Sequence, residues 1–292
     1  MLSTDFTTIP SQCFLGEGPY WHSERGSFFW VDIENGKLFE HHLVSGSTRN
    51  WKFSDRLNVV LEGQNGKLIL GIGRKLARFD LETEELKWLC EVEEDLPLHR
   101  FNDGKVDGKG RIWIGTLSTL FTDEAGSLYR IGGDLKPVVQ LADLTISNGL
   151  AWTEDQKTFY FIDTPTRQIR EFDFDLESGE IRFRRVAVEV PSELGFPDGM
   201  CIDQEGMLWV GHYGGSGVFR WNPQTGELLD KIILPVPHVT SCCFGGENLD
   251  YLLITTAQEN LSPEQMKQYP QSGNVFLVKV NVPGCRSNLA GI

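Results

Sequence analysis

The sequence predicts an all-β protein, a six-bladed β-propeller with four antiparallel strands per blade. The main observation is an apolar strand that recurs six times, beginning at Phe28, Leu68, Ile112, Phe159, Leu208 and Leu252. Successive starts are 40, 44, 47, 49 and 44 residues apart, and propeller blades repeat at about 40 to 50 residues. The 40% hydrophobic content supplies a large core, and 31 glycines supply the turns. Because a closed ring of repeats is one unit, we expect residues 1–292 to form a single domain.

The fourth repeat shows the four strands of one blade most clearly. Residues 149–152 are a short apolar strand, and residues 158–164 are a second strand rich in aromatic and branched side chains. Residues 168–175 alternate between polar and apolar side chains, and after a turn a fourth alternating strand occupies 181–190. This periodicity of two is typical of half-buried strands.

The last repeat lacks a fourth strand of its own. The N-terminal segment 5–13 is the available candidate, and its pairing there would close the ring and remove an exposed edge. The late segment 262–269 predicts the one helix, with Ser262 as N-cap and Pro263 at the first helical position. We expect this helix to be a surface insertion in the last blade.

Six oxygen-bearing side chains hold one phase in the repeat, ten or eleven residues before each apolar strand. They are Glu17, Asn58, Asn102, Asn148, Asp198 and Ser241. Because each is expected just before the innermost strand of its blade, all six should converge on one rim of the central channel. Carboxylate and amide oxygens are hard ligands that suit Ca²⁺, Mg²⁺ or Mn²⁺. A cation would also relieve the repulsion between the carboxylates of Glu17 and Asp198 in a partly dry channel.

Tight turns offer a second interpretation of the same residues. Asn148-Gly149 and Asp198-Gly199 are typical hairpin dipeptides. Asn58-Val59 and Asn102-Asp103 are not, and turns alone do not explain why oxygen ligands keep one phase. We therefore favour a channel site over a set of turns.

Charge and targeting signals exclude several classes of partner. The net charge of −14, without any run rich in Lys and Arg, argues against binding to nucleic acid or to anionic membranes. The first residues lack a basic start and an apolar core, and no later stretch approaches the ~18 apolar residues of a membrane span, so we expect a cytoplasmic protein. The six cysteines lack metal-ligand spacing and are expected to be buried thiols. The oligomeric state stays open.

Five segments spread along the chain form an ordered set: LGEGPYW (15–21), RFNDGKVD (100–107), ISNGLAW (146–152), PDGMCID (197–203) and TSCCFGG (240–246). With these segments the chain resembles the senescence-marker protein/regucalcin/gluconolactonase family over nearly its full length. The resemblance implies a six-bladed propeller with one divalent cation held by Glu17, Asn148 and Asp198. Ca²⁺ is the cation we expect, and Mg²⁺, Mn²⁺, Zn²⁺ and Fe²⁺ remain candidates.

The activity that the resemblance implies is hydrolysis of a sugar-acid (aldono) lactone to the open aldonic acid, a gluconolactonase-type hydrolase reaction at a carboxylic ester bond. A cation with three protein ligands keeps positions open for the lactone carbonyl and water. Asp198 would accept a proton from the attacking water. Arg100 and Asn102 would contact the substrate, Asp103 would support them, and a substrate contact by His99 or His212 stays open.

One departure from the family concerns substrate choice. Animal members carry a glutamate shortly after the strand that here ends near Thr116, whereas in this chain no acid follows until Asp123. This difference implies another sugar preference or another lid, and the particular aldonolactone stays open.

Three other functions compete with the lactonase. A Ca²⁺-binding regulator of the regucalcin type would use the same site, but two charged ligands favour only modest affinity. A calcium-dependent phosphotriesterase or arylesterase would use a similar channel for apolar substrates. A propeller used only as a binding platform would leave the channel idle, and the phased ligands argue against it.

Overall fold

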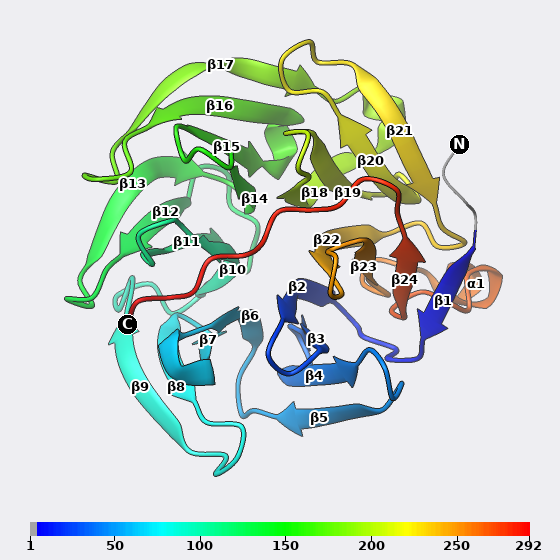
Figure 1. Cartoon of the computed structure of the whole chain (residues 1–292), viewed down its shortest axis with the longest axis horizontal. Helices are drawn as coiled ribbons and strands as arrows, with labels where there is room; N and C mark the ends of the chain where they lie inside the picture. The colour runs from blue at the N-terminus through cyan, green and yellow to red at the C-terminus, as the bar shows by residue number, and fades with distance from the viewer. Residues whose placement is uncertain (1–4) are drawn as a thin grey trace.

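Six four-stranded antiparallel sheets surround a central axis in the computed structural model, which describes residues 5–292 (Figure 1). This arrangement confirms the predicted six-bladed propeller. Within each sheet the first strand lies nearest the axis and the fourth lies at the outer edge.

In the first five blades, four strands follow one another along the chain. The first two blades consist of β2 (Gly16–His22), β3 (Ser27–Asp32), β4 (Lys37–His42) and β5 (Thr48–Lys52), then β6 (Leu57–Glu62), β7 (Leu68–Ile72), β8 (Lys75–Phe79) and β9 (Leu86–Glu91). The next two consist of β10 (His99–Val106), β11 (Ile112–Ser118), β12 (Gly126–Ile131) and β13 (Pro137–Leu144), then β14 (Ser147–Trp152), β15 (Thr158–Asp163), β16 (Gln168–Phe174) and β17 (Ile181–Glu189). The fifth consists of β18 (Phe196–Ile202), β19 (Leu208–Tyr213), β20 (Gly217–Trp221) and β21 (Leu228–Ile233). Short 3₁₀ turns lie at η1 (Gln64–Gly66), η2 (Thr164–Thr166) and η3 (Ser192–Leu194).

The sixth blade closes the ring with strands from both ends of the chain. Its strands are β22 (Val239–Gly245), β23 (Tyr251–Thr256), β24 (Val275–Lys279) and β1 (Phe6–Ile9). β1 pairs antiparallel with β24, as the sequence predicted, so the last blade gains its fourth strand from the N-terminus. The predicted helix is α1 (Pro263–Gln268), which lies between β23 and β24 and begins with a capping box at Ser262. Residues 5–292 contain no helix that combines the length and apolar character of a membrane span.

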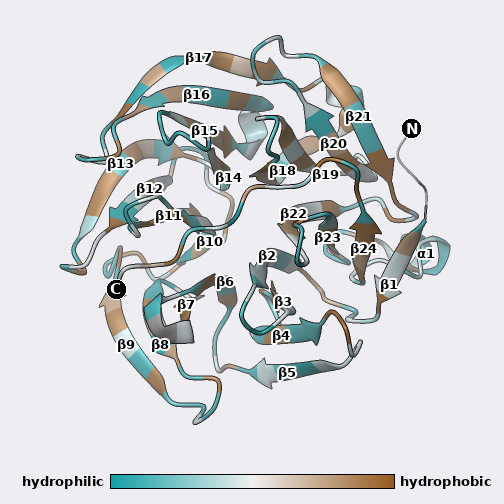
Figure 2. Ribbon diagram, viewed as in Figure 1, coloured by the Kyte–Doolittle hydropathy of each residue, from teal (hydrophilic) through white to brown (hydrophobic). Residues whose placement is uncertain are grey.

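The apolar strands that repeat in the sequence are the second strands of the blades, and they form the core. Trp30, Trp113 and Trp209, one from each of three second strands, are at most 1% exposed. Trp113 and Trp209 each donate from Nε1 to a buried aspartate, Asp107 and Asp203, at 2.8 Å. Outer strands such as β9 and β21 instead contain both hydrophilic and hydrophobic residues (Figure 2). The second strands are thus buried in the core, whereas the outer strands also expose hydrophobic side chains such as Trp88 and Ile233.

A β-bulge interrupts every innermost strand at the phased polar position or directly beside it. The register between first and second strands shifts at Glu17/Tyr20, Leu57/Val59, Phe101/Gly104, Asn148/Leu150, Pro197/Met200 and Val239/Ser241. The expectation that the phased residues precede the innermost strand was wrong by a few positions, because each lies within the first four residues of that strand. A bulge adds an unpaired residue and changes the direction of a side chain. The phased residues therefore lie within the strands, but the regular alternation of side chains between the two faces is broken there.

The C-terminal segment crosses one end of the central channel (Figure 1). Its backbone donates to the distal ends of the inner strands, from Cys285 to Ile202 at 3.1 Å and from Ala290 to Glu62 at 2.8 Å. Asn288 adds a side-chain bond to the Val106 carbonyl at 3.0 Å. The segment thus restricts access at this end and leaves the opposite rim, where the phased residues lie, as the approach for a ligand.

Candidate active site at the channel rim

Two buried carboxylates, Glu17 on β2 and Asp198 on β18, share the rim of the channel. Their residues are 8% and 7% exposed. Burial, followed by the charge of Asp103, raises the pKa of Glu17 to about 8. Burial, followed by the charge of Glu17, raises the pKa of Asp198 well above its usual range. Strands from the first and fifth blades therefore bring two acids into one electrostatic field, and without a cation that field favours their protonated forms.

A chain of hydrogen bonds connects the remaining candidate residues. The Nη1 group of Arg100 donates to Oδ1 of Asn102 at 2.8 Å, and Nδ2 of Asn102 donates to Oδ1 of Asn148 at 3.0 Å. The Nδ2 group of Asn148 then donates to Oγ1 of Thr164 at 2.8 Å, which itself donates to the Pro197 carbonyl at 2.9 Å. The chain holds the amide of Asn148 in one orientation and couples it to the two residues expected to bind substrate.

Two aspartates at the ends of second strands fix the backbone that leads into the site. Asp32 accepts hydrogen bonds from the amides of Phe14 and Leu15 at 3.1 and 3.2 Å, just before Glu17. Asp163 accepts from the amides of residues 145 and 146 at 3.2 and 2.9 Å, just before Asn148. The sequence carried the signal, since strands FFWVD and FYFID both end in aspartate. Sequence reasoning missed this positioning role.

Several polar atoms at the rim have no protein partner. Oδ1 of Asp103 accepts from the Gly104 amide at 2.7 Å, whereas its Oδ2 atom is buried without a hydrogen bond. Both polar side-chain atoms of Asn58 are likewise buried and unpartnered. Burial also raises the pKa of Asp103. Buried polar groups of this kind cost free energy unless a ligand or water forms hydrogen bonds with them. The rim therefore favours a bound ligand or water.

Glu259 is a further acid that sequence reasoning did not assign to the site. It lies in the connection between β23 and β24, and its charge raises the pKa of both Glu17 and Asp198. Burial raises its own pKa, and Arg100 opposes this effect. No phase in the repeat marks Glu259, because it belongs to the one long insertion of the last blade.

The two histidines left open as substrate contacts are both engaged within the protein. His212 is fully buried, accepts or donates at Nδ1 with the Leu194 carbonyl at 2.8 Å, and packs 4.2 Å from the ring of Phe219. Burial lowers its pKa to about 4, so it is a neutral packing residue. His99 is held by Glu93, with Nδ1 and Oε2 2.8 Å apart.

The donor set at the rim fits a hard divalent cation. Glu17 and Asp198 offer carboxylate oxygens and Asn148 an amide oxygen, and a nearby positive charge would lower the raised pKa values of both carboxyls. Over residues 5–292, no three or more His, Cys, Asp and Glu side chains are grouped to hold a metal. The expected ligands are two acids and one amide, which is a different kind of set.

Fold and site together define a six-bladed propeller with an acidic, oxygen-rich rim. Comparison with known proteins then identifies the family: residues 15–258 match the SMP-30/Gluconolactonase/LRE-like region, and the chain belongs to this family. Regucalcin of Oryctolagus cuniculus is 35% identical over 275 residues, which is 92% of each chain.

Solved structures agree with this assignment. One is described as a calcium-binding protein, regucalcin, from Agrobacterium tumefaciens; it is 28% identical, with a TM-score of 0.92 over 97% of this chain and 95% of that chain. A luciferin-regenerating enzyme is also 28% identical, with a TM-score of 0.90 over 98% of this chain and all of that chain.

Proposed function

We propose that this protein is a metal-dependent lactonase that hydrolyses a sugar-acid lactone to the open aldonic acid. The observation that carries the proposal is the meeting of Glu17, Asn148 and Asp198 with Arg100 and Asn102 at one rim. The family, whose name includes gluconolactonase, supports the same class of reaction.

The proposed cation is held by Glu17, Asn148 and Asp198. When bound, it supplies a Lewis acid for the lactone carbonyl. Ca²⁺ is our first choice, because the ligand oxygens are hard and the structurally similar regucalcin is described as calcium-binding.

Asp198 is the proposed general base. Its carboxylate is buried beside Glu17, and in its ionised form it would accept a proton from the water that attacks the lactone. The metal-free environment raises its pKa, so Asp198 needs a neighbouring positive charge to serve as a base at neutral pH. Base and metal ligand are therefore coupled roles in this proposal.

Arg100 and Asn102 are the proposed substrate-binding residues. The Nη1 group of Arg100 is occupied by the Phe101 carbonyl and Asn102, at 2.9 and 2.8 Å, and this leaves the Nε and Nη2 edge of the guanidinium to meet hydroxyl or ring oxygens. Asn102 holds Asn148 through Nδ2, so a substrate that contacts Asn102 is placed beside the ligand set. Asp103 supports this arrangement through its bond to the Gly104 amide.

The test is acid release from a panel of gluconolactone, galactonolactone, xylonolactone and arabinonolactone. The protein is first treated with a chelator, and Ca²⁺, Mg²⁺, Mn²⁺, Zn²⁺ or Fe²⁺ is then added separately. We expect hydrolysis above the spontaneous rate that requires a divalent cation. Phenyl acetate and paraoxon serve as competing substrates. Hydrolysis of these alone would favour the arylesterase or phosphotriesterase, and Ca²⁺ binding without any hydrolysis would favour the regulator.

A further inference from the structure

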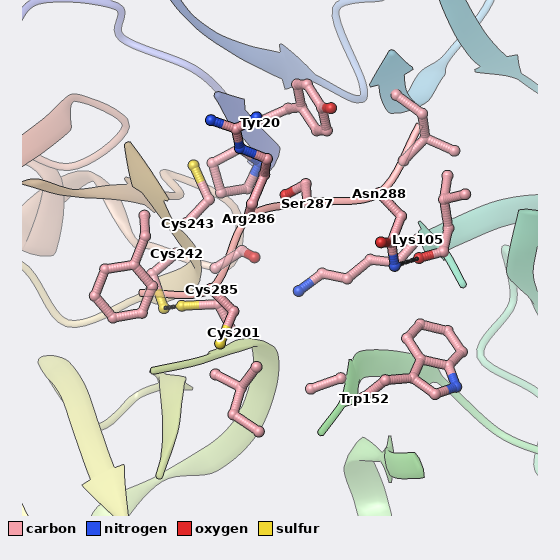
Figure 3. A pocket seen from close by; sticks show the side chains of 18 of the residues that line it. Tyr20, Lys105, Trp152, Cys201, Cys242, Cys243, Cys285, Arg286, Ser287 and Asn288 are labelled. Carbon is pink, nitrogen blue, oxygen red and sulfur yellow. Dashed lines mark hydrogen bonds between the residues drawn. The ribbon is translucent and has the colours of Figure 1, made fainter. Parts of the chain in front are cut away.

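Four of the six cysteines line one cavity inside the propeller, at the end crossed by the C-terminal segment (Figure 3). The cavity has a volume of about 380 Å³. Cys201 comes from β18, Cys242 and Cys243 from β22, and Cys285 from the C-terminal segment. All four are free thiols, and the lactonase site does not use them.

Cys201 and Cys242 are already in contact. Their Sγ atoms are 3.5 Å apart, and Sγ of Cys242 also lies 3.4 Å from the Trp209 carbonyl. A disulfide requires about 2.05 Å between the sulfurs, so the pair must close by roughly 1.5 Å, which rotation of the two side chains can supply.

The backbones that carry these cysteines also approach closely. A Cβ atom placed on Gly199 would lie 3.0 Å from Cα of Ser241, and these residues are close in sequence to Cys201 and Cys242 respectively. β18 and β22 are neighbouring inner strands. Formation of a bond between the two sulfurs therefore requires no separation or rearrangement of the blades.

We propose that Cys201 and Cys242 are a redox modification site, at which a hydroperoxide forms a disulfide between the inner strands of the fifth and sixth blades. In the first step one sulfur attacks a peroxide oxygen, giving a sulfenic acid and water. The second sulfur then displaces that hydroxyl oxygen as a second water. The two thiols lose two electrons and two protons, and hydrogen peroxide is reduced to two waters.

The environment determines the order and the speed of these steps. Cys201 is 8% exposed and Cys242 is 1% exposed, so the peroxide reaches Cys201 first. Burial, reinforced by Cys242, raises the pKa of Cys201, while Lys105 opposes this and Asp203 adds to it. Because the thiolate is the reactive form, the reaction is slow at neutral pH and accelerates as the pH rises.

The disulfide would connect the two strands next to the channel rim. Cys201 lies three residues after Asp198, and Cys242 directly follows Ser241. The proposal does not depend on the lactonase activity, since neither thiol belongs to the set of residues proposed for that activity.

The test uses the folded full-length protein treated with hydrogen peroxide at pH 7 and pH 8.5. Remaining thiols are blocked with N-ethylmaleimide, and tryptic peptides are mapped without reduction. We expect the thiol count to fall by two, a link between fragments 186–220 and 232–267, and a higher melting temperature that dithiothreitol reverses. Fragment 232–267 contains both Cys242 and Cys243, so the variant Cys243→Ser must retain the link and Cys242→Ser must lose it.

Cys90→Ser is the matched control, because Cys90 is half-buried and lies on the outer strand of another blade. Its removal should leave the link unchanged. Absence of a linked peptide under conditions that modify Cys90 would overturn the proposal. A link that disappears in Cys243→Ser would also overturn it, and this variant with the wild type decides the matter even where Cys242→Ser does not fold.

Discussion

Replacement of Glu17 by glutamine should make the metal-free protein more stable at alkaline pH. Glu17 is a buried acid whose pKa rises from 4.5 to about 8 in the fold, chiefly through burial. Its unfolded-state pKa is near 4.3 to 4.5. Between these two values the folded state holds a proton that the unfolded state has lost, so the folded state loses stability as the pH rises from about 4.5 to 8.

The size of this effect follows from the same two pKa values. At 1.36 kcal/mol per pH unit, the full difference corresponds to at most about 5 kcal/mol above pH 8. Asp198 shares the field, so part of this cost is relieved when either acid keeps its proton. Glutamine preserves the shape of the side chain and removes the charge, and hence most of the dependence on pH.

The assay is chemical denaturation at pH 5, 7 and 9 in the presence of a chelator, with wild type, Glu17→Gln and Glu177→Gln compared. Glu177 is the control because its side chain is 80% exposed. Wild type and the control should lose stability between pH 5 and pH 9 relative to Glu17→Gln. Ca²⁺ should restore wild type at pH 9 and have little effect on the variant. Equal pH profiles for wild type and Glu17→Gln would refute the assignment of Glu17 to a shared buried field.

Three further predictions address substrate binding, packing and ring closure. Arg100→Lys should lower kcat/KM for the best lactone about tenfold or more, because one ammonium cannot keep the bonds to Asn102 and Phe101 and also replace the Nε and Nη2 edge proposed to meet the substrate, and an unchanged kcat/KM would contradict the role of Arg100. Gly199→Ala should cost about 1 to 3 kcal/mol in denaturation, since its Cβ would lie 2.1 Å from Oγ of Ser241, and Ser241→Gly should recover part of the loss; equal stability of Gly199→Ala and wild type would contradict the close approach. Removal of residues 1–9 should lower the melting temperature and promote aggregation, because it exposes the edge of β24, whereas an unaltered melting temperature would contradict closure by β1.

The period of the sequence predicted the fold because each blade carries the same local signals. The apolar second strands became β3, β7, β11, β15, β19 and β23, and the segment at 5–13 contributed β1. The bulges were not predictable, because a bulge is a mismatch between two paired strands and one strand alone does not reveal its partner's register. For this reason the sequence predicted the phased residues just outside the inner strands, whereas in the structure they lie inside them.

The site could be predicted only where it repeats. Glu17, Asn148 and Asp198 occupy equivalent positions in their repeats. Because the blades surround one axis, equivalent positions of the inner strands lie close together. Thr164 and Glu259 have no counterpart in the repeat, and their roles depend on side-chain orientation and on the long insertion before β24. Contacts of this kind follow from tertiary packing, which a single sequence does not specify.

The most direct test of the central claim is acid release from the best aldonolactone by wild type and Asp198→Asn, each with saturating Ca²⁺ after chelation. Asp134→Asn, at an exposed surface position, is the control. Loss of a general base typically lowers the rate about 10² to 10⁴-fold. Because Asp198→Asn also removes a charged metal ligand, its loss of rate should lie toward the larger value. The account predicts a cation-dependent wild type, an equally active control and a variant reduced by at least about a hundredfold. Full activity of Asp198→Asn, or hydrolysis by wild type that is independent of any divalent cation, would contradict it.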